Sequence, residues 1–203
     1  MTSGGRVALR RDLAALVLAA LGVLTAAAAE APAPWGIDQL MQELAQVKSA
    51  RARFSERKQM AILNAPLDSS GTLVYTAPAR LEKNTLAPRP ESLVLDRDKL
   101  VIEYRERNQR RTLVLQDYPV IWAFVESIRS TLAGDLATLN RFYRTSLDGS
   151  EDKWRLSLKP AEPKMQALVK EITIGGSRNR LRTIEVVEAE GDRSVMTITE
   201  DAP

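Results

Sequence analysis

Residues 91–104 read ESLVLDRDKLVIEY, two apolar runs that are separated by the polar triplet Asp96-Arg97-Asp98. Side chains alternate between the two faces of a strand, so every second residue shares a face. The residues that share the apolar face are Leu93 and Leu95 in the first run and Leu100, Ile102 and Tyr104 in the second. This pattern predicts a β-hairpin with one apolar and one polar face. Such a hairpin has to belong to a larger sheet whose apolar face is covered.

The same alternation continues on both sides of the hairpin and predicts about eleven strands. Short turns join most of them, which favours antiparallel pairing in one large sheet. The expected strands are residues 52–63, 69–76, 79–86, 91–96, 99–106, 110–116, 143–147, 153–160, 168–175, 181–189 and 193–200. The fold class is therefore mainly β with some α, in a single domain over residues 30–203.

Two segments have a helical period instead. Residues 37–50 carry apolar side chains at helical spacing and predict one amphipathic helix. Residues 119–142 form a second helical region, interrupted by Gly134-Asp135, which is a hinge or a boundary between two helices. The second region has two interpretations: a helix that covers a packed core, or a lid over an apolar cavity.

The apolar face of so large a sheet is either filled by its own side chains or encloses a cavity. If a cavity exists, the strand residues expected to line it share the apolar face: Leu73, Tyr75, Leu81, Leu93, Leu95, Leu100, Ile102, Leu113, Leu115, Trp154 and Leu156. The residues expected to close it from the helical region are Ile121, Phe124, Ile128 and Leu132.

Composition excludes several classes of chemistry. The 203 residues include no cysteine and no histidine, which excludes disulfides, thiol nucleophiles and histidine-dependent triads. Asp and Glu remain, so a carboxylate-pair hydrolase is the enzymatic alternative, but no pair of carboxylates stands out. We expect no enzyme activity, no metal and no cofactor. The formal charge is +3, but without the N-terminal segment 26 basic and 25 acidic residues remain, and a nearly neutral chain gives no electrostatic reason for a nucleic-acid partner.

The first 29 residues predict a secretory signal peptide. Arg6, Arg10 and Arg11 precede the apolar run from Leu13 to Leu24, and Ala27-Ala28-Ala29 supplies an A-x-A cleavage site. A retained membrane anchor is the alternative, although the run is short for a membrane span. Cleavage after Ala29 would release the chain into the periplasm. No cysteine follows the apolar run, so the chain cannot be acylated in the manner of a lipoprotein.

Short segments of the chain also follow the order of motifs in one protein family. They are ARFSE at 52–56, GTLVYTAP at 71–78, PESLVLD at 90–96 with Lys99-Leu100, LAGD at 132–135 and WRLSLKP at 154–160. These segments are similar to A-x-F-x-Q, G-x-L-x-x-x-R-P, P…L-V-x-D-G…L-W, L-x-G-D and F-x-L-x-P. With the opening helix before them, they resemble the periplasmic outer-membrane lipoprotein carriers of the LolA family over nearly the whole mature chain.

The resemblance implies an incomplete, strongly curved β-barrel with a helical lid over an apolar cavity. It implies a monomeric carrier that takes acylated lipoproteins from an inner-membrane ABC-type export complex and passes them to an outer-membrane acceptor. The family arginine that ties strand to lid corresponds to Ala77 here, and Arg80 is the candidate replacement for this lid lock. A carrier of another acyl lipid, such as a glycolipid or a polyene-type product, is the alternative.

Overall fold

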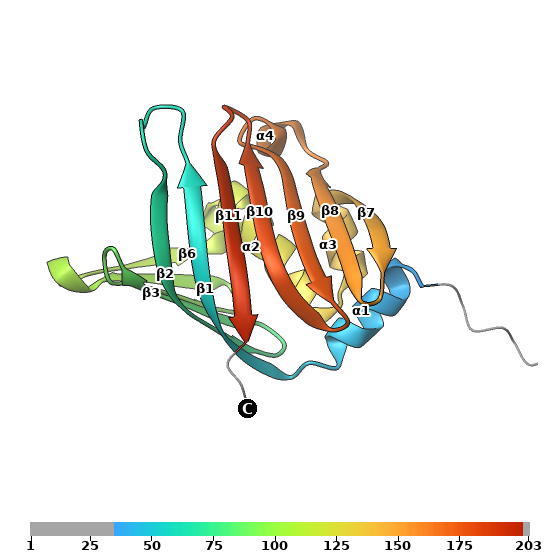
Figure 1. The fold of residues 1–203 in the computed structure, drawn as a ribbon. Helices are drawn as coiled ribbons and strands as arrows, with labels where there is room; N and C mark the ends of the chain where they lie inside the picture. Colours follow the sequence, from blue (N-terminus) through green and yellow to red (C-terminus); the bar gives the residue numbers. More distant parts are fainter. Residues whose placement is uncertain (1–34, 201–203) are drawn as a thin grey trace, which may run out of the picture. The chain divides into compact units, whose positions relative to one another are not determined.

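The computed structural model describes residues 35–200, so the predicted signal peptide and its cleavage site lie outside the described residues. Residues 35–200 form one open, curved, antiparallel sheet of eleven strands (Figure 1). The strand order is β6-β5-β4-β3-β2-β1-β11-β10-β9-β8-β7. The predicted fold class is confirmed, and the sheet does not close into a barrel because β6 and β7 are its two free edges.

The first six strands form a meander before the helical region: β1 (Ser49–Gln59), β2 (Leu67–Thr76), β3 (Arg80–Ala87), β4 (Glu91–Asp96), β5 (Lys99–Tyr104) and β6 (Gln109–Val114). Five follow it: β7 (Tyr143–Ser150), β8 (Lys153–Pro160), β9 (Val169–Ser177), β10 (Arg180–Glu188) and β11 (Arg193–Glu200). β1 pairs with β11 from Ala52↔Glu200 to Gln59↔Arg193 and so joins the two meanders. β1 ends before residue 63 because a turn follows it, in which Leu63 N–H donates to Met60 O at 3.0 Å.

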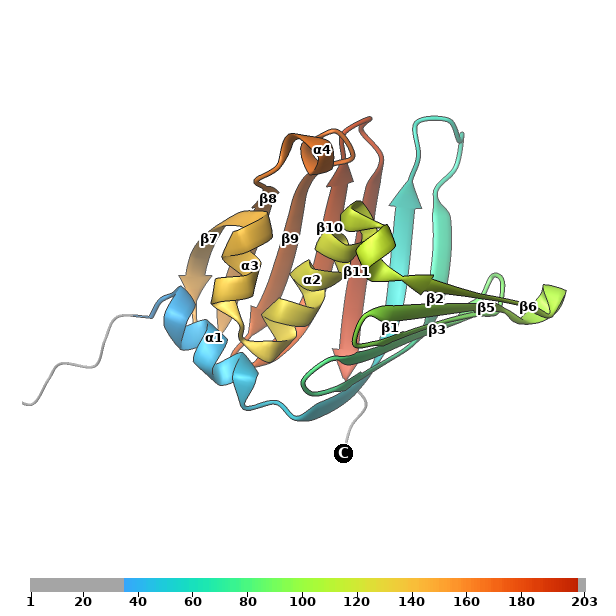
Figure 2. The same cartoon turned by 180° about the vertical axis from the view of Figure 1, so that it is seen from behind.

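The helices lie on one face of the sheet (Figure 2). They are α1 (Ile37–Ala45), α2 (Pro119–Ala133), α3 (Leu136–Phe142) and the short α4 (Pro163–Gln166). The sequence patterns did not predict α4, nor the 3-10 turns Arg105–Arg107 and Leu115–Asp117. α1 ends before residue 50 because β1 begins at Ser49. The predicted break at Gly134-Asp135 separates α2 from α3.

Gly134 ends α2 in the left-handed conformation, with φ of 69°. A side chain there would overlap the carbonyl oxygen of Met41 in α1, so glycine permits this close approach of the two helices. Asp135 then caps α3, because its Oδ1 accepts a hydrogen bond from Thr138 N–H at 2.9 Å. The boundary between α2 and α3 thus consists of the C-cap of α2 at Gly134 and the N-cap of α3 at Asp135.

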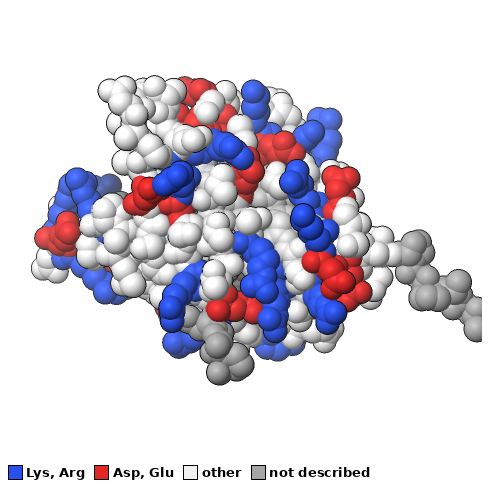
Figure 3. Space-filling model, in the orientation of Figure 1, with Lys and Arg blue, Asp and Glu red and all other residues white. Residues whose placement is uncertain are grey.

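The face of the sheet opposite the helices is polar. Figure 3 shows blue and red side chains lying next to one another over the strands of this face. Ion pairs between neighbouring strands account for part of the pattern: Arg57–Asp68 joins β1 to β2 at 2.7 Å, and Arg193–Glu185 joins β11 to β10 at 2.7 Å. The predicted division into an apolar and a polar face is therefore confirmed for these strands.

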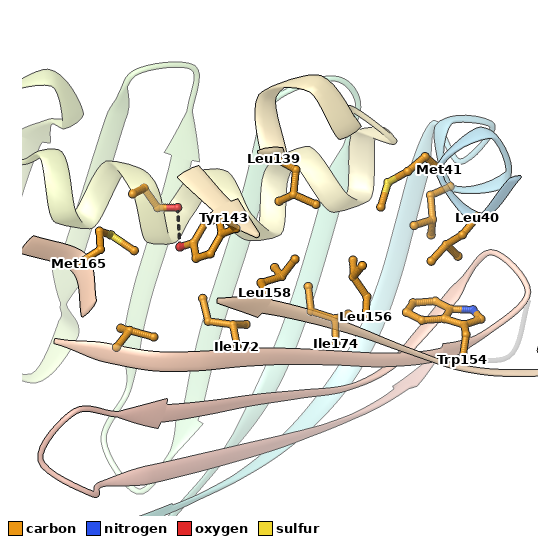
Figure 4. Close-up of a cluster of buried hydrophobic side chains, with 13 residues drawn as sticks. Leu40, Met41, Leu139, Tyr143, Trp154, Leu156, Leu158, Met165, Ile172 and Ile174 are labelled. Carbon is orange, nitrogen blue, oxygen red and sulfur yellow. Dashed lines mark hydrogen bonds between the residues drawn. The ribbon is translucent and has the colours of Figure 1, made fainter. Parts of the chain in front are cut away.

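Side chains fill the space between sheet and helices at both ends of the sheet. At one end, α1 and α3 pack on β8 and β9, and the buried cluster includes Leu40, Leu139, Leu156, Leu158 and Ile172, each 0% exposed (Figure 4). At the other end, Leu95, Leu100 and Leu115 form a smaller cluster against the start of α2. The middle of the sheet is covered less tightly, and the candidate site lies there.

Tyr143 predicts a pH dependence of stability. Its ring is 1% exposed, and its hydroxyl donates to Ala123 O in α2 at 3.0 Å. Burial raises the pKa of Tyr143 to about 12, while the unfolded chain ionises near pH 10. The native state binds the hydroxyl proton of Tyr143 more tightly than the unfolded state does. The resulting stabilisation of the native state is complete below pH 10 and is lost as the pH rises to about 12.

We therefore expect wild-type protein to lose about 1–3 kcal/mol more unfolding free energy between pH 10 and 12 than Tyr143→Phe. Urea unfolding of both proteins across this range measures the difference. Tyr143→Phe is the internal control because other groups that titrate at high pH contribute equally to both curves. Parallel curves would show that Tyr143 is not protected from ionisation in the native state.

Candidate functional site

A cavity of about 620 Å³ lies between the middle of the sheet and α2. Its walls are mainly aliphatic. The side chains from the first meander are Ala52, Leu73, Tyr75, Leu81, Leu93, Leu95 and Leu100, and those from the second are Leu181, Ile184, Val186, Met196 and Ile198. α2 contributes Phe124, Val125, Ile128 and Leu132. The volume and the apolar lining are typical of a small-molecule site.

The structure brings together part of the predicted residue set. From the strands, Leu73, Tyr75, Leu81, Leu93, Leu95 and Leu100 line the cavity. From the predicted lid, Phe124, Ile128 and Leu132 line it on the α2 side. Phe124 is 37% exposed, so part of its ring also faces solvent. Their role in lipid binding stays a prediction, but their position around one space is now defined.

The remaining predicted residues lie elsewhere. Ile102, Leu113, Leu115 and Ile121 lie in the part of the β4–β6 cluster that does not line the cavity, whereas Leu95 and Leu100 of the same cluster do. Trp154 and Leu156 belong to the cluster under α1 and α3, where Trp154 is 2% and Leu156 0% exposed. The expectation that all of these side chains line one concavity is corrected, because helices and neighbouring side chains fill both ends of the sheet.

Sequence reasoning left out the cavity residues of β10 and β11. The sequence shows the alternation of apolar residues in these two strands, at Ile184, Val186, Met196 and Ile198, but it does not show that β11 pairs with β1. The pairing of β1 with β11 joins residues near the two ends of the domain and brings these side chains next to Ala52 and Leu73. The lining also includes Arg51, Glu82 and two ion pairs, Glu56–Lys83 and Arg180–Glu200, which no motif indicated.

A polar network ties α2 to the β4–β5 turn. Arg129 Nη1 donates to the carbonyl oxygen of Arg97 at 2.9 Å, and the same guanidinium pairs with Glu126. Glu126 is 2% exposed and accepts a further hydrogen bond from Trp122 Nε1 at 2.8 Å. An arginine of α2 thus binds a carbonyl group of the β4–β5 turn.

Arg80, the predicted lid lock, has other partners. Its guanidinium pairs with Glu82 at 2.9 Å and with Asp96 at 3.4 Å, both on neighbouring positions of β3 and β4. Its side chain is 43% exposed. The structure therefore places Arg80 in a surface ion-pair group and Arg129 at the contact between α2 and the sheet.

Arg129→Met is expected to lower the free energy of unfolding by about 2 kcal/mol, because the buried Glu126 loses its charged partner. The change should also speed amide hydrogen exchange in α2 more than in the sheet. Arg80→Met is the matched control and is expected to change stability by less than about 1 kcal/mol, since its ion pairs are exposed. Equal exchange in α2 of both variants would contradict the assignment of Arg129 as the tie.

Within residues 35–200, no helix is both long and apolar enough to span a bilayer. The same residues contain no group of three or more His, Cys, Asp or Glu side chains placed to hold a metal ion.

Comparisons with known proteins give a family and several similar folds. Residues 26–202 match the family model described as outer membrane lipoprotein carrier protein LolA-like. No curated protein sequence matches the chain. A LolA superfamily protein from Nitrosomonas europaea is similar in structure, with 11% identity, a TM-score of 0.44, and coverage of 83% of this chain and 96% of that one.

Two further solved structures are similar at the same level. One is the MucA/MucB complex of Pseudomonas aeruginosa, with 14% identity and a TM-score of 0.45; the match covers 82% of this chain and 58% of that one. The other is a domain described as an outer membrane lipoprotein-sorting protein from Vibrio parahaemolyticus, with 9% identity and a TM-score of 0.45; the match covers 81% and 89%.

Proposed function

The chain belongs to the LolA-like family of outer membrane lipoprotein carrier proteins, and we propose that it carries acylated lipoproteins through the periplasm. In this proposal the cavity encloses the acyl chains while the protein part of the cargo stays in solvent. Export by the predicted signal peptide would place the carrier between the two membranes.

The observation that carries the proposal is the aliphatic cavity of about 620 Å³ between the sheet and α2. Exposure of an acyl chain to water costs about 0.8 kcal/mol per CH₂ group. A lipid with several chains therefore cannot cross an aqueous compartment unshielded. Leucine, isoleucine, valine and methionine side chains from six strands and two helices provide the required apolar cover.

The walls also suit a carrier that has to release its cargo. Burial against aliphatic side chains is non-directional, so the free energy of binding depends mainly on the area removed from water. α2 is held to the β4–β5 turn by one hydrogen bond from Arg129 to Arg97 O, in addition to its side-chain packing. Movement of this helix would open the cavity, and would also have to break the contact of Ala123 with the packed cluster under α1 and α3.

Under this proposal the donor is an inner-membrane ABC-type export complex and the recipient an outer-membrane acceptor. The chain acts as a monomer without catalytic activity, cofactor or metal. A carrier of another acyl lipid, such as a glycolipid or polyene-type product, is the second candidate. It is favoured by the same aliphatic lining, which recognises chains and not the molecule attached to them.

Mass spectrometry of the material that co-purifies with the exported protein tests the proposal. Acylated lipoprotein fragments are the expected result, and a glycolipid or polyene-type product would favour the second candidate. In parallel, the lipid-free protein should increase the fluorescence of an environment-sensitive fatty-acid probe. A protein that carries no lipid and takes up no acyl probe would contradict both candidates.

A further inference from the structure

The apolar cavity contains an ion pair on its sheet side. Lys83 Nζ donates to Glu56 Oε2 at 2.6 Å, and Ser194 Oγ donates to Glu56 Oε1 at 2.6 Å. All three residues line the cavity, and they come from β3, β1 and β11. The side chains of Lys83 and Glu56 are 30% and 20% exposed, so both charges are largely withdrawn from solvent.

Lys83 is surrounded by the apolar wall. In the sheet register it lies opposite Leu73 on one side and Leu93 on the other, and both leucines line the cavity. Its Nζ also lies 4.9 Å from the centre of the Phe54 ring. The ammonium group is therefore placed where an acyl chain in the cavity would pass.

Glu56 is ionised at neutral pH. Burial alone would raise the pKa of Glu56, but hydrogen bonds from Lys83 and Ser194 and the positive charges of Lys83 and Lys58 lower it below its ordinary value. Partly buried ion pairs contribute little net stability, since the cost of desolvation offsets the attraction. A hydrophobic pair would stabilise this wall at least as well, so stability gives no reason for a charged pair here.

A lysine ammonium has three N–H donors. One is used by Glu56, and the Phe54 ring takes up one side of the group, so a donor is left for a ligand in the cavity. Because Glu56 already neutralises Lys83, an anion would gain little from the pair and would approach a carboxylate. A neutral acceptor fits better. Every O-acyl or N-acyl chain carries one, the carbonyl oxygen at its root.

We propose that Lys83, held by Glu56, donates a hydrogen bond to the ester or amide carbonyl of the bound acyl chain. The inference rests on the proposed carrier function and deepens it. The cavity would select acyl esters and amides, which are the chains of lipoproteins and glycerolipids, over free fatty acids and plain hydrocarbons.

Displacement of a naphthylamine dye, whose fluorescence rises in apolar surroundings, tests this proposal with three ligands of equal chain length: methyl dodecanoate, dodecanoate and dodecane. The double variant Glu56→Gln/Lys83→Met, which leaves neither an unpaired carboxylate nor an unpaired ammonium group in the cavity, is compared with wild-type protein. The double variant is expected to bind methyl dodecanoate about 10-fold more weakly and dodecane equally well. Lys58→Met is the matched control, because Lys58 also forms a partly buried ion pair, with Glu188 at 2.8 Å, but does not line the cavity.

Equal weakening of all three ligands would show that Lys83 only shapes the wall, and would overturn the inference. A larger loss for dodecanoate than for the methyl ester would overturn it in favour of an anionic ligand. If wild-type protein binds the dye and dodecane but shows no preference for the ester, the inference fails while the carrier function stands. If it binds none of them, the carrier function itself is contradicted.

Discussion

Phe124→Glu is expected to weaken acyl-probe binding by roughly 30- to 100-fold, because it places a charge at the apolar cavity. Phe124 lines the cavity from α2 and is 37% exposed. Its partial exposure means that the glutamate can reach solvent in the unliganded protein, so the fold should lose less than about 1 kcal/mol. Titration with a fluorescent fatty acid measures the affinity, and thermal unfolding measures the stability.

Tyr118→Glu is the matched control for this change. Tyr118 is 43% exposed and immediately precedes α2, but it does not line the cavity. The Tyr118→Glu variant should bind the acyl probe with wild-type affinity. A folded Phe124→Glu protein that also binds like wild type would show that α2 does not meet the acyl chain, and the lid assignment would fail.

Leu156→Ala is expected to have the largest effect on stability and no direct effect on binding. Leu156 is 0% exposed in the cluster under α1 and α3, and truncation leaves a void among close-packed side chains. The expected loss is about 3–4 kcal/mol of unfolding free energy, which corresponds to a decrease in Tm of roughly 6–15 °C. Urea unfolding and a thermal scan measure the two quantities.

Leu93→Ala is expected to have the opposite effects, a small loss of stability and a clear loss of acyl-probe binding. Leu93 is half-buried and lines the cavity, so its truncation should cost little stability and weaken the acyl probe. Probe binding of Leu156→Ala, measured well below its Tm, should equal that of wild type. If Leu156→Ala instead leaves stability unchanged and abolishes binding, the cavity extends to β8 and the original sequence prediction for Leu156 holds.

Local pattern was sufficient to predict the eleven strands and the three longer helices, but not α4 or the 3-10 turns. Alternation around the turn at residues 96–98 indicated the β4–β5 hairpin, and the same rule found the other strands. The position of Gly134 indicated where α2 stops, because only glycine adopts a positive φ without strain. Each of these features depends on residues that are close in sequence.

The extent of the cavity could not be predicted in this way. Leu93 and Leu156 occupy equivalent positions in the alternation of their strands, yet one faces an open space and the other a filled core. The difference comes from α1 and α3, which cover β8, and this is a property of the tertiary arrangement. The pair Lys83–Glu56 lies on strands separated by β2, so no local motif could indicate it.

The contact of Arg129 with Glu126 and the β4–β5 turn left a clearer signal in the sequence than the Lys83–Glu56 pair did. Glu126 and Arg129 stand three residues apart in a helix that is otherwise rich in apolar residues. Charged residues in such a helix require partners when they are buried. That requirement was a signal for a polar network, although its partner on the sheet, the carbonyl group of Arg97, carries no side-chain signature.

The two free edges of the sheet, β6 and β7, bear on how much cargo the protein can hold. In a closed barrel the number of strands sets the diameter, and widening it would break main-chain hydrogen bonds. Here α2 and α3 lie between β6 and β7 in the chain and pack on the sheet through side-chain contacts, which can rearrange at lower cost. Under the proposed carrier function, a change of curvature would therefore let the cavity accommodate cargoes with different numbers of acyl chains with every strand pairing intact.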